Sequence, residues 1–221
     1  MSDRVLIVMD DPFELTTISA ALKLHGVNVI GEARKSSTAI SLMRSMQPEV
    51  LLIDMHLNQE HSIEIANMIR KEIPTIGIVM LVACPDFRIS GDDNSQIPVG
   101  TRIVLKKSIN DVSTLYEVIA ESKEFEAETP AMWVNGNISL HERALHTWMN
   151  QLTDVQVETW RLVASGLTNA EISRLRFVSE KSVEQVVSRI AQVLNIYPDK
   201  GKNLRVQLVN EYFRSIGAPT H

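Results

Sequence analysis

Short apolar runs alternate with longer amphipathic stretches through the first 125 residues of the chain. The runs are nearly continuous, which is typical of strands buried on both faces of a parallel sheet. Asp11, Pro12 and Glu14 mark a helix start, because they supply a cap, a proline at the first helical position and an acid three residues after the cap. The pattern predicts strands over residues 5–9, 27–30, 50–53, 76–81 and 103–105, and helices from residue 11, over 38–46, through 63–69 and over 115–122. Such alternation favours a doubly wound α/β fold with a parallel five-stranded sheet.

One helix of this alternation is missing. Residues 85–99 are rich in turn-forming residues and have little helical period. We expect a loop or a short, irregular helix there.

The second half of the chain has a different pattern. Residues 124–150 show no clean period and are interpreted as a linker between a domain at 1–123 and a domain at 151–221. Thr153 with Gln156, and Thr168 with Glu171, are capping boxes that each open an apolar-periodic run. Ser179 caps a third run and residues 204–213 form a fourth, so an all-α four-helix domain is expected.

Composition narrows the class of protein. The 221 residues are 44% hydrophobic and 22% charged, as in globular chains. The longest apolar run, residues 76–84, is far shorter than the roughly 20 residues of a membrane span, and no signal peptide is visible. The single cysteine, Cys84, excludes an internal disulfide and a cysteine-built metal site. We therefore expect a cytoplasmic protein without a membrane partner.

The net charge of −5 is unevenly spread. Residues 1–147 carry −7, whereas residues 148–221 carry +2. This asymmetry suggests two units with different partners.

Acidic residues follow two of the predicted strands, and lysines follow another. Asp10 and Asp11 come after the first strand, Asp54 after the third, and Lys106 and Lys107 after the fifth. Because ligands of open parallel sheets bind beyond the carboxyl ends of the strands, these groups are expected to converge. Clustered carboxylates suit Mg²⁺, which could neutralise a phosphoryl group while one carboxylate attacks phosphorus. Taken singly, each residue could instead be a helix cap, a strand end or a solvated charge.

Here the chain resembles the receiver domain of two-component response regulators, over residues 4–122. The resemblance implies that Asp54, in Leu-Leu-Ile-Asp-Met, is the phosphoacceptor and that Asp10, Asp11 and Asp54 are the metal ligands. It further implies that a lysine at the end of the fifth strand contacts the phosphoryl group, for which Lys107 fits best and Lys106 is the alternative. A sensor histidine kinase is the implied partner.

The sequence also departs from the receiver pattern. Aligned without a gap, the first acid of the family's pair is Met9 and the second is Asp10. Val82 stands in place of the switch hydroxyl, and Val104 stands in place of the aromatic residue that reports it. Because valine cannot donate the hydrogen bond that stabilises the phosphorylated state, we expect an atypical receiver.

The helical tail, from Leu152-Thr153 to Ser182-Val183, resembles a LuxR-type helix-turn-helix, and the whole chain resembles the NarL/FixJ type of regulator. The resemblance implies binding of double-stranded DNA, with the helix that starts at Ser179 in the major groove. Its outward face is expected to carry the contacts, namely Lys181, Ser182, Glu184, Gln185, Ser188 and Arg189. Glu184 stands where the family usually has lysine, so it could alter specificity. A surface that binds protein is the alternative.

The last helix of this family pairs with its twin, which implies a homodimer. Leu204, Leu208 and Tyr212, spaced by four, would form that face, or would complete the core of the helical domain itself.

Three hypotheses follow for function. The first is a non-enzymatic transcription regulator in which Asp54 accepts a phosphoryl group. The second keeps DNA binding but uses the receiver-like domain, without phosphorylation, for dimerisation or protein docking. The third, a Mg²⁺-dependent phosphohydrolase, ranks last because His56 occupies the position where a second carboxylate would act as general acid.

Overall fold

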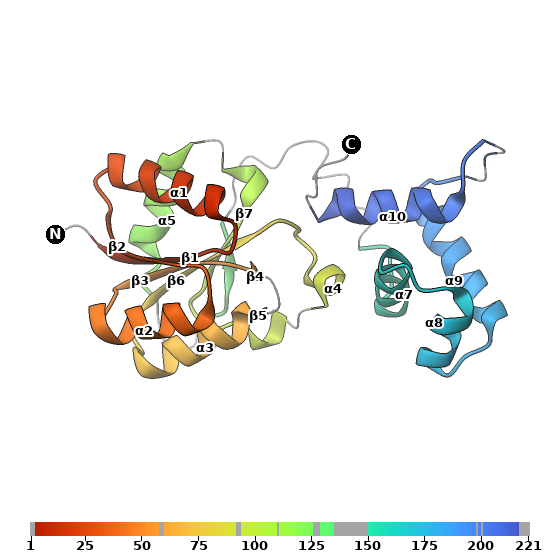
Figure 1. The fold of residues 1–221 in the computed structure, drawn as a ribbon, viewed down its shortest axis with the longest axis horizontal. Coiled ribbons are helices and arrows are strands. Elements are labelled where there is room, and N and C mark those ends of the chain that lie inside the picture. The colour runs from red at the N-terminus through yellow and green to blue at the C-terminus, as the bar shows by residue number, and fades with distance from the viewer. Residues whose placement is uncertain are drawn as a thin grey trace. The chain divides into compact units, whose positions relative to one another are not determined.

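The computed structural model describes residues 3–57, 60–91, 94–109, 111–125, 129–134, 150–197, 199 and 201–216. It divides into two compact units. Residues 1–83 and 95–138 form the first, which we call the α/β unit, and residues 84–94 and 139–221 form the second, the helical unit (Figure 1). The helical unit is therefore discontinuous in sequence. No helix in the described part of the chain is both long and apolar enough to cross a membrane.

A six-stranded parallel sheet forms the centre of the α/β unit, in the order β2-β1-β3-β6-β7-β8. Five of its strands confirm the predicted runs, and they are β1 (Arg4–Val8), β2 (Asn28–Ala33), β3 (Val50–Asp54), β6 (Gly77–Val82) and β7 (Arg102–Leu105). The sixth strand, β8 (Met132–Trp133), pairs with β7 and lies in the range that we interpreted as a linker. Strands β3 and β6 are buried along their whole length, which accounts for their continuous apolar sequence.

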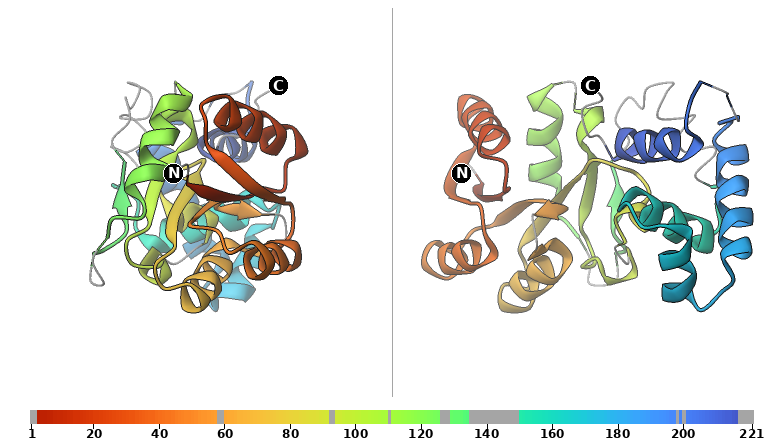
Figure 2. Two further views of the ribbon diagram at one scale, coloured as in Figure 1. Left: turned by 90° about the vertical axis from the view of Figure 1, so that its left-hand side faces the viewer. Right: turned by 45° about the vertical axis from the view of Figure 1, so that its right-hand side comes forward.

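Helices cover both faces of this sheet, as the alternation predicts. Figures 1 and 2 show α1 and α5 on one face and α2 and α3 on the other. Their bounds are α1 (Pro12–Leu24), α2 (Ser36–Met46), α3 (Ser62–Glu72) and α5 (Val112–Glu121). Leu15 and Leu22 of α1 and Leu115 of α5 pack with strand residues in one apolar cluster.

Two short features lie at the carboxyl ends of the strands. A two-stranded antiparallel hairpin, β4 (His56–Leu57) and β5 (Glu60–His61), follows β3 directly. The 3₁₀ turn η2 (Lys106–Ser108) follows β7. Both features border the end of β3, where Asp54 lies.

The range 85–99 contains one turn of helix, α4 (Phe87–Ser90), and a 3₁₀ turn, η1 (Asn94–Gln96). This agrees with the expected short, irregular helix. Residues 84–94, which include α4, pack within the helical unit and not within the α/β unit that surrounds them in sequence.

The four predicted helices of the helical unit are α7 (Asp154–Ala164), α8 (Asn169–Arg176), α9 (Glu180–Val193) and α10 (Leu204–Ser215). Thr153 forms the predicted capping box with Gln156, and Thr168 and Ser179 cap the next two helices. Gly166 ends α7 with φ +85°, a conformation that glycine adopts without strain. Local signals therefore set the helix boundaries.

Trp160 is at the centre of the core of the helical unit and is fully buried. Its indole Nε1 donates a hydrogen bond to the carbonyl oxygen of Leu208 over 2.9 Å. Its ring meets that of Tyr212 edge to face, with 5.5 Å between centroids. These contacts fix α10 against α7 and satisfy the one polar atom of the tryptophan.

Candidate functional site: a carboxylate–lysine cluster and an exposed helix face

Asp54 ends β3 and is almost fully buried, with 4% of its side chain exposed. Its Oδ1 accepts a hydrogen bond from the backbone N–H of His56 over 3.1 Å. Its Oδ2 lies 2.6 Å from Nζ of Lys106. The buried carboxylate is therefore paired with a cation.

Lys106 contacts two acids at once. Besides Asp54, its Nζ lies 2.8 Å from Oε2 of Glu14, near the start of α1. Burial on its own would lower the pKa of Lys106, but the charges of Asp54 and Glu14 and the hydrogen bonds to them outweigh it, so the pKa is raised. The lysine therefore stays charged and bridges β3 to α1.

The structure pairs Asp54 with Lys106, which we gave as the alternative to Lys107. The Nζ of Lys106 donates to Oδ2 of Asp54, whereas Lys107 is exposed. Because η2 begins directly at the end of β7, consecutive side chains point in different directions, and Lys106 is the one turned toward Asp54.

Glu14 was missed as a site residue because it fits the acid of a capping box so well. The structure shows only half of that box, in which Asp11 Oδ1 accepts from the backbone N–H of Glu14 over 2.7 Å. The side chain of Glu14 turns instead to Lys106. The Lys106 pairing would have been visible only from the way α1 and η2 meet in three dimensions.

The predicted metal ligands lie in different environments. Asp11 is exposed and caps α1, while Asp10 is half-buried. Met9, at the first acid position of the family, is fully buried in the apolar core. The described residues contain no group of three acids, histidines or cysteines arranged to hold a metal ion. The residues present thus do not fit the Mg²⁺ site that the fold implies.

The switch positions are apolar and inaccessible. Val82, at the end of β6, is fully buried, and Val104 and Ile103 in β7 are buried as well. None of these side chains can donate or accept a hydrogen bond. The cluster of Asp54, Lys106 and Glu14 therefore has no hydroxyl group at the position of Val82 and no aromatic side chain at the position of Val104.

The second candidate site is one face of α9. Val183, Val187 and Ile190 are buried in the core of the helical unit. The opposite side is exposed and consists of Lys181, Glu184, Gln185, Ser188 and Arg189. We call these five residues the α9 outer face. The sixth predicted contact, Ser182, is half-buried and lies 2.8 Å from the hydroxyl of the capping Ser179.

The turn before α9 carries an unusual residue. Phe177 ends α8 in the left-handed conformation, with φ +53°, and is 96% exposed. Bulky side chains rarely adopt this φ. Its backbone N–H still closes the helix by donating to the carbonyl of Arg174, so the turn is retained at a conformational cost.

Leu208 and Tyr212 of α10 complete the core of the helical unit. Leu204 packs against the same core and is partly buried. The structure therefore favours the second of the two interpretations of these three residues, and the expected dimer face at these positions is wrong within the described unit.

Comparisons with known proteins agree with both halves of this arrangement. The family model described as the response regulator receiver domain matches residues 5–120. The response regulator protein VraR of Staphylococcus saprophyticus is 26% identical over 199 residues, which cover 89% of this chain and 92% of that protein. VraR of Staphylococcus aureus is 24% identical over 197 residues, with the same coverage of both chains.

Solved structures show the same fold. The two-component response regulator RcsB in complex with DNA matches with a TM-score of 0.55 and 21% identity, covering 98% of this chain and 100% of that one. A structure of two RcsB dimers bound to two parallel DNAs gives 0.56 and 21%, again over 98% and 100%. RcsB of Salmonella typhimurium gives 0.51 and 20%, over 95% and 98%. The chain belongs to the response regulator receiver family and has the NarL/FixJ-type order of a receiver followed by a helix-turn-helix unit.

Proposed function

We propose that the protein is a transcription regulator that binds double-stranded DNA through the α9 outer face. The observation that carries the proposal is the division of α9 into one buried apolar face and one exposed polar face directly after a capped turn. Such a helix can enter the major groove with its first turns against the base edges. The related RcsB structures were solved with DNA, which agrees with this use of the fold.

Each side chain of the α9 outer face has a role that its chemistry permits. Gln185 can donate to and accept from adenine, while Lys181 and Arg189 can bind phosphates. Glu184 cannot bind phosphate, but it can accept from the amino group of cytosine. The small positive charge of the tail predicts weak non-specific binding and a preference that depends on Gln185 and Glu184.

Fluorescence anisotropy of a labelled, mixed-sequence duplex over a salt series tests the proposal. Lys181→Ala should weaken binding and reduce the slope of log K against log salt by about 0.9, as expected for one lost phosphate contact. The matched control is Lys71→Ala, which removes an exposed lysine from α3 of the α/β unit. No binding by the wild type, or equal losses in both variants, would reject the proposal.

For the α/β unit we propose a role in docking or dimerisation that does not require phosphorylation. Two observations support this second proposal. Met9 replaces an acid of the family's pair, and Val82 replaces the switch hydroxyl. A phosphoryl group on Asp54 would find no hydroxyl at position 82 to report it.

Light scattering on the full chain tests this second proposal. The molar mass should be the same with and without Mg²⁺ and beryllofluoride, which mimics an aspartyl phosphate. A dimer in both conditions indicates constitutive assembly, and a monomer in both leaves DNA as the template for dimerisation. A Mg²⁺-dependent shift from monomer to dimer that Asp54→Asn abolishes would refute it and restore phosphorylation control.

A further inference from the structure

A segment from the middle of the receiver sequence forms part of the helical unit. Residues 84–94 lie between β6 and β7 in the sequence, yet they belong to the same compact unit as residues 139–221. Ile89 is fully buried and Cys84 is 3% exposed, and both join Trp160 and Tyr212 in one apolar core. We call residues 84–91 the strap. Its two core side chains are as well covered as those of the helices that they pack with.

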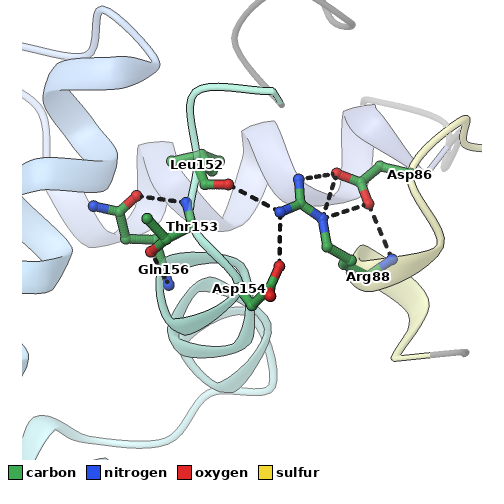
Figure 3. Close-up of polar contacts among 6 residues, drawn as sticks. All are labelled: Asp86, Arg88, Leu152, Thr153, Asp154 and Gln156. Atoms are coloured by element: carbon green, nitrogen blue, oxygen red, sulfur yellow. Dashed lines mark hydrogen bonds and ion pairs between the residues drawn. The ribbon is translucent and has the colours of Figure 1, made fainter.

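Arg88 fastens the strap to the start of α7 (Figure 3). Its guanidinium bonds to both carboxylate oxygens of Asp86, at 2.7 Å from Nη2 and 3.0 Å from Nε at the closest. Its Nη1 donates to the carbonyl oxygen of Leu152 and to Oδ1 of Asp154, each over 2.9 Å. One planar guanidinium thus links the strap to the two residues on either side of the α7 cap.

One further hydrogen bond holds the strap against α10. The buried hydroxyl of Tyr212 in α10 donates to the carbonyl oxygen of Ile89 over 2.6 Å. Gly91 ends α4 with φ +84°, a conformation that glycine adopts without strain. A Cβ at this position would lie 1.7 Å from Nη1 of Arg161 in α7, so the end of that side chain would have to move.

The strap also begins close to Asp54. Leu81 of β6 lies beside Asp54 in the sheet, and the strap starts three residues later at Cys84. Two residues of chain thus separate the neighbour of Asp54 from the core of the helical unit.

We propose that the strap buttresses α7 and α10, so that the helical unit keeps its DNA-binding arrangement only while this piece of receiver sequence stays docked. The strap contacts α7, and α7 packs against α9, so the strap supports the position of the α9 outer face. The expected effect on DNA binding rests on the proposed function. The docking of the strap does not rest on it and can be measured without DNA.

Amide hydrogen exchange on the full chain measures the docking. The amides of Ile89 and Gly91 donate within the strap, and those of Gln156 and Val157 donate within the first turn of α7. Arg88→Ala should make all four exchange about tenfold faster, because charge-assisted hydrogen bonds are lost. The control is Arg174→Ala, which removes an exposed ion pair with Glu171 elsewhere in the helical unit and should leave the four amides unchanged.

The outcomes separate the two proposals. Unchanged exchange at these amides in Arg88→Ala overturns the strap. If that variant does not fold, Arg88→Lys replaces it, since one ammonium cannot reach Asp86, Leu152 and Asp154 together, and unchanged exchange there overturns the strap equally. Faster exchange with an unchanged affinity for the mixed-sequence duplex overturns the buttressing step. Failure of the wild type to bind that duplex rejects the proposed function alone, because the exchange data still decide the docking.

Discussion

At the residue scale, Lys106 pairs with two acids, and one of them, Asp54, is buried. Replacing it with methionine preserves the apolar stem but leaves Asp54 as a buried charge without its cation. Removing one partner of a fully buried pair costs roughly 3–5 kcal/mol. Because 24% of the Lys106 side chain is exposed, we expect Lys106→Met to lower the free energy of unfolding by about 2 kcal/mol. Urea denaturation followed by circular dichroism measures this loss.

Lys107→Met is the matched control, since it makes the same chemical change at the next, exposed position. It should change stability by less than about 0.5 kcal/mol. A larger loss at position 107 than at position 106 would contradict the assignment of the lysine.

Gly91 and Gly166 allow a second comparison, because both have positive φ in the helical unit. Alanine in this conformation costs about 1 kcal/mol wherever it is placed. A Cβ at Gly166 would meet no atom within 4 Å, whereas one at Gly91 would meet Arg161. We therefore expect both variants to lower the melting temperature, but only Gly91→Ala to speed amide exchange at Ile89. Equal exchange in the two variants would show that Arg161 moves away at no cost to the strap.

Single residues were predictable where local chemistry decides their role. Asp54 follows from the end of an apolar run, and Thr153 and Ser179 follow from capping patterns that involve only neighbours in sequence. The choice between Lys106 and Lys107 could not be made, because a strand end is uncertain by one residue and each step redirects the side chain. Glu14 and Lys106, which form an ion pair, are 92 residues apart in sequence, and no periodic pattern in the sequence indicates such a contact.

At the element scale, α9 carries one charge that opposes its proposed function. Glu184 is exposed on the α9 outer face, so Glu184→Lys replaces a repulsive charge with an attractive one beside the DNA backbone. We expect tighter, less selective binding and a log K–log salt slope that is steeper by about 0.9. Anisotropy with the mixed-sequence duplex measures both quantities.

The control for this charge reversal is Glu121→Lys, at the exposed end of α5 in the α/β unit. It changes the net charge of the protein equally, so it isolates the effect of position. If the two variants tighten binding to the same extent, net charge and not α9 governs the interaction.

Elements were predictable where their period and caps agree. The long helices and the strands β1, β3, β6 and β7 match their patterns because they bury apolar side chains along their length. Strand β8 was missed because two residues carry no period, and it is held by its pairing with β7. Helix α4 is a single turn, whose packing partners lie more than 60 residues away in sequence.

At the scale of the whole molecule, the discontinuity of the helical unit predicts the behaviour of a cut chain. A specific protease site inserted between residues 134 and 150 would separate the strap from α7–α10 covalently. Because the strap belongs to the core of the helical unit, we expect the two fragments to elute together in gel filtration after cleavage. Separate elution of the wild-type fragments would contradict this.

The same cleavage applied to Arg88→Ala provides the comparison. Those fragments should separate at a lower urea concentration than the wild-type fragments, since the Arg88 bonds to Leu152 and Asp154 cross the cut. Equal midpoints would mean that Ile89 and Cys84 alone hold the fragments together.

The order of the two units and their fold classes could be predicted from the sequence, because the change from strand–helix alternation to helices alone is a property of long windows. The discontinuity could not. It depends on Ile89 finding Trp160 and Tyr212 in three dimensions, and an isolated isoleucine in a turn-rich segment is equally compatible with an ordinary loop.

The strap also sets the order of events during synthesis. Ile89 leaves the ribosome 123 residues before Tyr212, whose hydroxyl it binds through its carbonyl oxygen. At about 5–20 residues per second, that interval is roughly 6–25 seconds. During this interval the sheet of the α/β unit can form, but the β6–β7 connection cannot yet pack, because the core of the helical unit is not complete. The nascent chain therefore exposes an apolar segment that chaperones can recognise until α10 has been synthesised.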